Sequence, residues 1–200
     1  MNPSPPETRA SLILRLQDVA DVEAWDSLVV IYGPVVFRMA RRQGFQAADA
    51  DNLVQEVLIS VARSVSQWLE RKDRGSFRAW LLRIARNQAI NLLTRVATRP
   101  FELDGEEAER RLDNLQAPEG ELSSQFDLEY RREVFQWAAD QIRTSVAETT
   151  WQAFWLTHIQ GIGIAEAADQ LGVKVGNIYF ARSRVMSRLR DLVKQFEVDP

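Results

Sequence analysis

The sequence has no cysteine, a single histidine (His158), and no apolar run long enough to cross a membrane. The lack of cysteine excludes disulfides and thiolate metal sites, and the lone histidine excludes His-based triads and multi-histidine metal sites. Residues 1–7 lack the basic and apolar pattern of a signal peptide, and no Gly-rich phosphate loop is present. We therefore expect a cytoplasmic protein that is not an enzyme and has no catalytic residue, metal or cofactor.

A strand pattern is also missing, whereas apolar residues recur at helical spacing along much of the chain. The predicted helices span residues 11–43, 50–69, 77–97, 128–143 and 149–160, followed by a terminal helical pair. The expected N-caps are Asp21, Asp49, and Thr149 or Thr150. Gly44 is the expected stop of the first helical segment, which Pro34 kinks or divides. The predicted fold class is all-α.

Positive charge is scarce in the middle of the chain. Residues 101–133 hold eleven acidic and four basic side chains, a net charge of −7, so the remainder of this −3 chain sums to +4. Pro100, Gly105, Pro118 and Gly120 interrupt the same stretch, which shows no sustained periodicity. We predict a flexible tail at residues 1–10 and a flexible acidic linker at residues 99–127. This linker separates two small helical domains, 11–98 and 128–200.

The terminal pair of helices has the pattern of a helix-turn-helix. A short helix with Ala167 and Ala168 on one side stops at Gly172, a residue suited to a left-handed cap. The second helix repeats apolar residues at Ile178, Ala181, Val185, Leu189 and Leu192. It also carries four arginines, which favours DNA binding in the major groove over an αα-hairpin that only packs a bundle.

Two internal motifs resemble a known family. The run Asp51-Asn52-Leu53-Val54-Gln55-Glu56-Val57 and the run from Gly75 to Asn87 closely resemble the second conserved region of bacterial sigma factors. The closest resemblance is to the extracytoplasmic-function (ECF) subfamily of the sigma-70 family. The terminal helix-turn-helix falls where that subfamily has its fourth conserved region. The resemblance covers about residues 11–97 and 128–192, in the expected order.

The resemblance implies a sigma factor that binds core RNA polymerase and directs promoter-specific transcription initiation in response to a signal. The implied partners are the clamp coiled coil of the largest polymerase subunit, the flap of the second largest, and promoter DNA. An anti-sigma factor stays open, and membrane insertion is not expected. The residues implied to bind core polymerase are Asp51, Asn52, Gln55 and Glu56. Their carboxylates and amides suit arginines on a partner helix, although a plain solvated face is the alternative.

The resemblance also places the minus-ten element of the promoter on the third helix and the loop before it. The residues implied to bind it are Trp68, Arg74, Trp80, Arg83, Arg86, Asn87, Asn91 and Arg95. Asn87 fills the position of a pocket for a flipped base, which needs an amide, an apolar wall and cations for the phosphates. Core packing is the alternative for Trp80, and Phe77 is expected in the core.

The minus-thirty-five element is implied to lie against the start of the last helix. The residues expected there are Lys174, Asn177, Tyr179, Phe180, Arg182, Ser183, Arg184 and Arg188. This chain departs from the common pattern, which has Gly-Thr-Val, a basic residue and a Ser-Arg pair. Here the run is Gly176-Asn177-Ile178-Tyr179-Phe180-Ala181, so the contacts are expected to shift by a residue. Tyr179 and Phe180 suit thymine methyls, sugars or a partner protein.

Two functions from other classes are weighed against the sigma factor. One is a stand-alone helix-turn-helix regulator that binds duplex DNA as a dimer, with residues 1–97 as a sensory or dimerising domain. The other is a sigma mimic that only sequesters an anti-sigma factor. The acidic linker has two interpretations as well: it follows the RNA exit path of the polymerase, as the family does, or it serves solubility and spacing.

Overall fold

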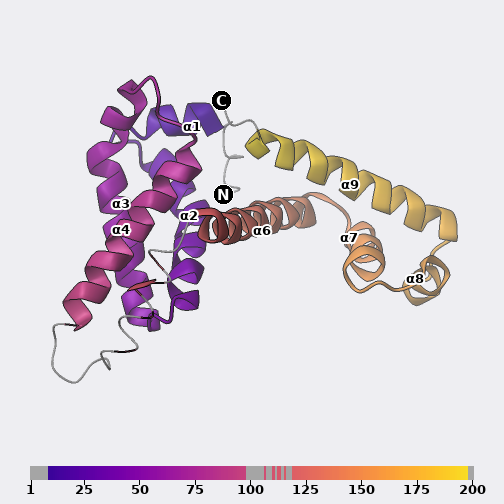
Figure 1. The fold of residues 1–200 in the computed structure, drawn as a ribbon. Coiled ribbons are helices and arrows are strands. Elements are labelled where there is room, and N and C mark those ends of the chain that lie inside the picture. Colours follow the sequence, from indigo (N-terminus) through magenta and orange to yellow (C-terminus); the bar gives the residue numbers. More distant parts are fainter. Residues whose placement is uncertain are drawn as a thin grey trace. The chain divides into compact units, whose positions relative to one another are not determined.

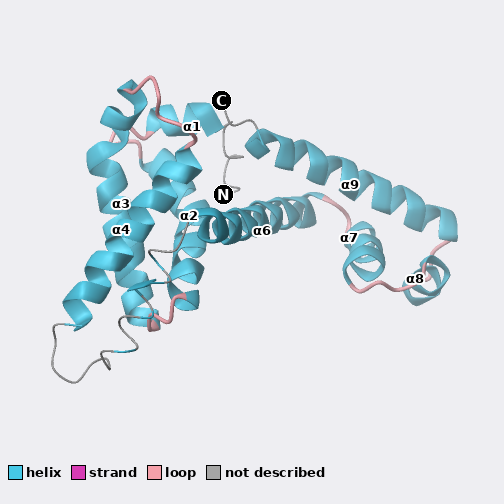
Figure 2. Cartoon of the chain, viewed as in Figure 1, coloured by secondary structure: helices cyan, strands magenta, loops and turns pink. Residues whose placement is uncertain are grey.

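The computed structural model describes residues 9–97, 106, 110, 112, 113, 115 and 119–197, and its regular elements there are all helices (Figure 1, Figure 2). The predicted all-α fold class is confirmed for these residues. In the described part of the chain, no helix combines the length and the apolar character needed to span a membrane. Residues 1–8 of the predicted tail and most of the predicted linker lie outside the described residues.

The chain divides into two compact units, Met1–Glu133 and Val134–Val198. The first unit holds α1 (Arg9–Arg15), α2 (Val22–Arg42), α3 (Ala47–Glu70), α4 (Phe77–Ala97) and the first part of α6 (Glu119–Ser145). The second holds the rest of α6, α7 (Glu148–Phe154), the π-helical turn η1 (Trp155–Ile159), α8 (Ile164–Leu171) and α9 (Val175–Glu197). Within the first unit, α3 packs against both α2 and α4 (Figure 1).

Asp21 organises the turn between α1 and α2. Its Oδ1 atom accepts a hydrogen bond from the backbone N–H of Ala24 at 3.1 Å, and its Oδ2 atom lies 2.7 Å from Arg15 Nε. The hydrogen bond from Arg15, followed by that from Ala24, lowers the pKa of Asp21. Pro34 lies inside α2, and Gly44, with φ +84°, follows its C-terminal end. The predicted cap at Asp21 and the predicted stop at Gly44 are therefore confirmed, but the predicted segment 11–43 is divided between Arg15 and Val22 and not at Pro34.

The helices α3 and α4 follow their apolar periodicity. Their buried apolar residues are Leu53, Val57, Val61, Val65 and Trp68 in α3 and Phe77, Leu81, Ala85, Ala89 and Leu93 in α4. The bounds of α4 match the prediction, and Ser76 Oγ accepts from the Ala79 N–H at 3.2 Å at its start. The prediction that Asp49 caps α3 is wrong, because α3 already begins at Ala47. Asp49 lies in the first turn instead, where a carboxylate still favours the helix dipole.

The first part of α6 packs on the first unit through apolar residues spaced four apart. Leu122, Phe126 and Tyr130 are buried, and the Tyr130 ring stacks on Tyr32 of α2 with 5.4 Å between ring centroids. The helix begins at Glu119, so its predicted start near residue 128 is wrong. Acidic side chains dominate the sequence around these apolar positions, and they mask the short periodic signal.

A buried carboxylate joins α6 to α2. Glu129 is only 2% exposed, and its oxygens accept hydrogen bonds from Arg38 and Arg42 of α2 and from Arg132 of α6. Arg38 also donates to Glu133, so one guanidinium bridges two turns of α6. Because a buried charge is costly unless it is paired and hydrogen-bonded, these contacts require α6 to stay in register with α2.

The second unit has a core of its own. One cluster joins α6, α7 and α9 through Ala138, Ala139, Ile142, Trp151, Phe154, Val185 and Leu189. A second joins α7, α8 and α9 through Ala153, Ala168 and Ile178. The predicted cap at Thr149 or Thr150 is wrong, because α7 begins at Glu148, and Ala147 before it makes no side-chain cap. The predicted single helix to residue 160 passes into the π-helical turn η1.

The predicted helix-turn-helix is present. The chain leaves α8 at Gly172, which has the left-handed value φ +63° and whose N–H donates to the carbonyls of Ala168 and Asp169. Ala168 is buried, and α9 starts after a short turn at Val175. The small side chain of Ala168 and the freedom of Gly172 together allow the two helices to cross closely.

Glu129→Gln is expected to loosen the first part of α6, because the neutral amide no longer balances Arg38 and Arg42. Breaking a fully buried pair costs about 3–5 kcal/mol, and the half-exposed arginines should reduce this to about 2 kcal/mol. Amide hydrogen exchange in residues 122–133 should then accelerate roughly tenfold or more. The control is Asp140→Asn, an exposed change on the same helix. Equal exchange in the two variants would contradict the structural role given to Glu129.

Candidate nucleic-acid interface

Asp51, Asn52, Gln55 and Glu56 form an exposed row on α3, here called the polar row. The opposite side of the same turns is buried at Leu53 and Val57, which is why the four polar side chains face solvent. Among the described residues, none of the four side chains takes part in an ion pair or a side-chain hydrogen bond. The row is therefore available to a partner.

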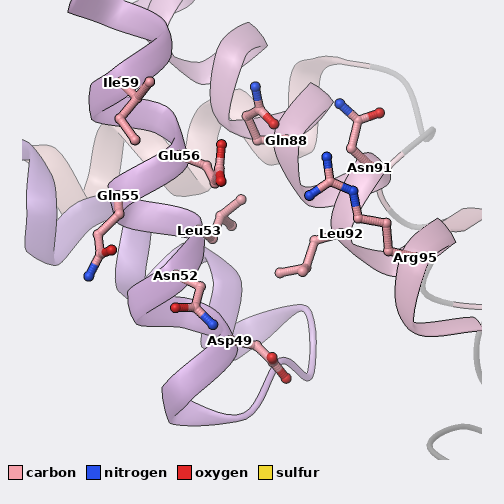
Figure 3. Close-up of a pocket in the computed structure, with 10 residues that line it drawn as sticks. All are labelled: Asp49, Asn52, Leu53, Gln55, Glu56, Ile59, Gln88, Asn91, Leu92 and Arg95. Carbon is pink, nitrogen blue, oxygen red and sulfur yellow. The ribbon is translucent and has the colours of Figure 1, made fainter. Parts of the chain in front are cut away.

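Part of the polar row lines a hollow of about 270 Å³ between α3 and α4 (Figure 3). Asn52, Gln55 and Glu56 line it from α3, and Asn91 and Arg95 line it from α4. Figure 3 shows the two groups on facing helices around this space. The residues predicted for polymerase and those predicted for the minus-ten element thus adjoin each other here. Asp51 does not line the hollow.

Gln88 is a residue of this surface that the sequence reasoning missed. It lines the hollow, and its Nε2 atom donates to Ser60 Oγ at 2.8 Å, which ties α4 to α3. Its spacing of three residues before Asn91 and seven before Arg95 places it on their helical face. This spacing could have identified Gln88 as part of the same surface from the sequence.

The second set of predicted residues runs along the solvent side of α4. This α4 stripe consists of Trp80, Arg83, Asn87, Asn91 and Arg95. Trp80 is half-buried and the other four are exposed, whereas Phe77 is buried as predicted. The stripe combines an aromatic ring, amides and guanidinium groups on one face, which is the chemistry that single-stranded nucleic acid requires.

Trp68 does not lie on that face. It is 4% exposed, and its ring stacks on Trp80 with 5.1 Å between centroids and packs edge-on against Phe77 at 5.6 Å. Its Nε1–H donates to the Arg74 carbonyl at 3.1 Å, while the Arg74 guanidinium lies 5.2 Å from the Trp68 ring centre. We therefore correct the role expected of Trp68. Trp68 continues the buried stripe of α3, and from there its side chain packs under Trp80 and holds the loop of Arg74.

The side chain of Arg86 also lies outside the α4 stripe. It is half-buried, and its Nε–H donates to the carbonyl of Leu115. On the same flank, Arg78 Nε lies 3.3 Å from Asp127, and its guanidinium lies 4.9 Å from the Tyr130 ring centre. Residues of the acidic stretch thus contact the arginines of this flank and leave Arg83 and Asn87 exposed.

The residues predicted at the start of α9 separate into two groups. Seven of them are exposed: Lys174, Asn177, Tyr179, Phe180, Ser183, Arg184 and Arg188. Arg182 is half-buried and its Nη2 atom lies 3.5 Å from His158 Nε2. Arg188 donates to the carbonyl and the hydroxyl of Ser145, at 3.2 and 3.1 Å. These two guanidinium groups contact the protein itself, and Arg182 is the one residue of the eight that is half-buried.

His158, in the π-helical turn η1, lies beside Arg182 of α9. Partial burial, and then the positive charge of Arg182, lower the pKa of His158. The imidazole is therefore biased toward its neutral form, which suits a close approach to a guanidinium group. Within the described residues, no cluster of histidine and acidic side chains is arranged to hold a metal ion.

Comparisons with known proteins identify proteins to which the chain is similar. A family profile described as Sigma-70 region 2 matches residues 28–99, which include α3 and α4. The chain is 30% identical over 194 residues to the ECF RNA polymerase sigma-E factor of Haemophilus influenzae, covering 94% of each chain. It is 28% identical to the ECF RNA polymerase sigma-E factor of Escherichia coli K12, covering 92% of this chain and 95% of the relative.

A further relative is the ECF RNA polymerase sigma factor SigE of Mycolicibacterium smegmatis, 28% identical over 191 residues. That match covers 96% of this chain and 70% of the relative. The similarity thus extends through both units and is not confined to the helix-turn-helix. The chain belongs to the ECF sigma factors of the sigma-70 family.

Proposed function

We propose that this sigma factor docks on core RNA polymerase through the polar row of α3 and holds promoter DNA with the α4 stripe and the start of α9. As a sigma factor it directs transcription initiation, and its partners are core RNA polymerase and promoter DNA. The observation that carries the proposal is the meeting of two exposed polar faces, on α3 and α4, around one hollow. Docking and DNA contact would then use adjacent surfaces of one rigid helix pair.

In this proposal, residues 11–98 act as sigma region 2 and residues 128–200 as sigma region 4, with residues 99–127 as the connection. The polar row meets arginines on the clamp coiled coil of the largest subunit, and the second unit meets the flap of the second largest. The carboxylate and amide oxygens of the row are acceptors for the N–H groups of guanidinium, and those of the carboxylates make charge-assisted hydrogen bonds. Synthesis of RNA is left to the polymerase, so no catalytic residue is assigned, and the place of action is the cytoplasm.

For the minus-ten element, Asn87 supplies the amide that hydrogen-bonds a flipped base. The neighbouring Trp80 ring, supported by Trp68, offers an apolar wall, and Arg83 suits the phosphates. Binding energy from these contacts offsets the cost of unpairing the base. Opening of the promoter therefore depends on the side chains of α4 and not on a chemical step of this protein.

The two rival functions predict different behaviour in solution. A stand-alone regulator would bind its operator tightly without polymerase, and a sigma mimic would bind a partner without supporting transcription. The test is to add the purified chain to core RNA polymerase and a pool of genomic fragments and to measure run-off transcripts. Promoter-dependent transcripts are expected only with both proteins present, and a failure to associate with core polymerase would overturn the proposal.

Replacing Gln55 and Glu56 together by alanine should weaken the affinity for core polymerase roughly tenfold or more, because truncating charged contacts at an interface costs several kcal/mol. Titration of labelled core enzyme measures this directly. Gln67→Ala, at an exposed amide of α3 outside the polar row, is the matched control. An unchanged affinity in the double variant would remove the polar row from the docking surface.

Asn87→Ala should slow open-complex formation roughly tenfold, since one hydrogen bond to the flipped base is lost, while the affinity for core polymerase stays the same. Permanganate footprinting of the melted bases gives the opening rate. Thr94→Ala serves as the control, because Thr94 lies exposed on the same helix and its hydroxyl donates only to the Ile90 carbonyl. If core affinity fell as much as opening, the assignment of Asn87 would be wrong.

Arg184→Ala should weaken promoter binding by the holoenzyme and reduce the slope of log K against log salt by about 1, as expected for one lost phosphate contact. Arg182→Ala should leave the slope nearly unchanged, because Arg182 faces His158 and not the exposed side of α9. Filter binding across a salt series measures both. The reverse order of the two variants would contradict the assignment of the exposed face.

A further inference from the structure

The most exposed large apolar side chain of the described residues is Phe180, which is 76% exposed near the start of α9. Two residues earlier, Ile178 is fully buried in the second unit. An α-helix turns by about 100° per residue, so Phe180 points about 200° away from Ile178. Phe180 therefore lies on the side of α9 opposite the core.

The neighbours of Phe180 on this side are small or polar. Gly176 lies four residues before it, and Ser183 and Arg184 lie three and four residues after it, all of them exposed. A Cβ added at Gly176 would meet no atom within 4 Å, so the space beside the ring is open. Ser183 and Arg184 add a hydroxyl and a cation beside the ring.

The positions of the cations on α9 limit the kinds of ligand that this patch can bind. Arg182 lies 3.5 Å from His158, and Arg188 donates to Ser145, so both guanidinium groups have protein partners. Arg184 lines a hollow of about 230 Å³ together with Phe180 and Asn177, and the apolar side chains of Val173, Ile178 and Ala181 also line it. An aromatic ring beside a cation matches DNA, where phosphate and base edge lie together in the major groove.

Only one feature of the major groove is apolar, and it is the C5-methyl group of thymine. Residues at the N-terminal end of a recognition helix are the ones that reach base edges. We propose that Phe180 reads thymine in the upstream promoter element by packing its ring against that methyl group, with Arg184 on the adjacent phosphate. This inference rests on the proposed function of α9 and adds how the base is distinguished.

The consequence is a promoter preference that depends on a methyl group and not on hydrogen bonds to guanine. Burying one methyl contributes about 0.8 kcal/mol, which corresponds to roughly a fourfold change in affinity. Tyr179 is also exposed, at 57%, but it lies about 100° from Phe180 and to the side of the patch. The ring of Phe180 is therefore the group to test.

The experiment uses the holoenzyme formed from the full chain and core polymerase. A promoter library with a randomised upstream element is selected for binding, and thymines of the selected element are then replaced singly by deoxyuridine. Deoxyuridine keeps base pairing and the hydrogen-bonding edge and removes only the methyl group. We expect a selected thymine whose replacement weakens binding by the wild-type holoenzyme roughly three- to fivefold.

The same replacement should have no effect with Phe180→Ala, and this variant should lose its preference for thymine at that position alone. Arg184→Ala is the matched control and should keep the full sensitivity to deoxyuridine. Phe180 is exposed, so its variant is expected to fold, and circular dichroism checks this. Equal sensitivity in Phe180→Ala and wild type, or a selected element without thymine preference, overturns the proposal and points to a protein contact. Loss of core association by the wild-type chain would instead defeat the proposed function itself.

Discussion

The burial of one apolar seam between α3 and α4 decides which residues of the first unit can meet a partner. Leu53, Val57 and Phe77 are removed from water, so their helical neighbours at Gln55, Glu56 and Asn87 must face outward. Because both helices are fixed by the same seam, the polar row and the α4 stripe hold a constant spacing around their shared hollow. The proposed contacts with polymerase and unpaired DNA require such a constant spacing, since small displacements at a binding site are costly.

The acidic stretch separates the two sequence motifs, and its C-terminal part also packs within the first unit. Glu129, Glu133 and Asp127 pair with arginines of α2 and α4, and three apolar residues of α6 lie beneath them. A buried ion pair of this kind adds little net stability but strongly favours one register, because any shift leaves a charge without its partner. On α4, Asp127 of the same stretch pairs with Arg78 beside the α4 stripe.

In the second unit, the short turn at Gly172 fixes the start of α9, and the core residues of α9 fix its rotation. That rotation directs Arg182 and Arg188 to protein partners and leaves Phe180 and Arg184 on the outer side. The exposed face at the start of α9 therefore combines the rings of Tyr179 and Phe180 with the cation of Arg184.

The sequence by itself determined the helices whose signals are local. The bounds of α4 and the stop at Gly172 follow from apolar spacing and from one glycine, both of which are readable within a few turns. The tertiary structure alone decided which polar residues stay exposed. Arg38 and Glu129 are 91 positions apart, and Arg86 meets the carbonyl of Leu115, so no local window contains both partners. The early start of α6 was missed because acidic side chains mask its short apolar period, and Trp68 was assigned to DNA although it continues the apolar stripe of α3.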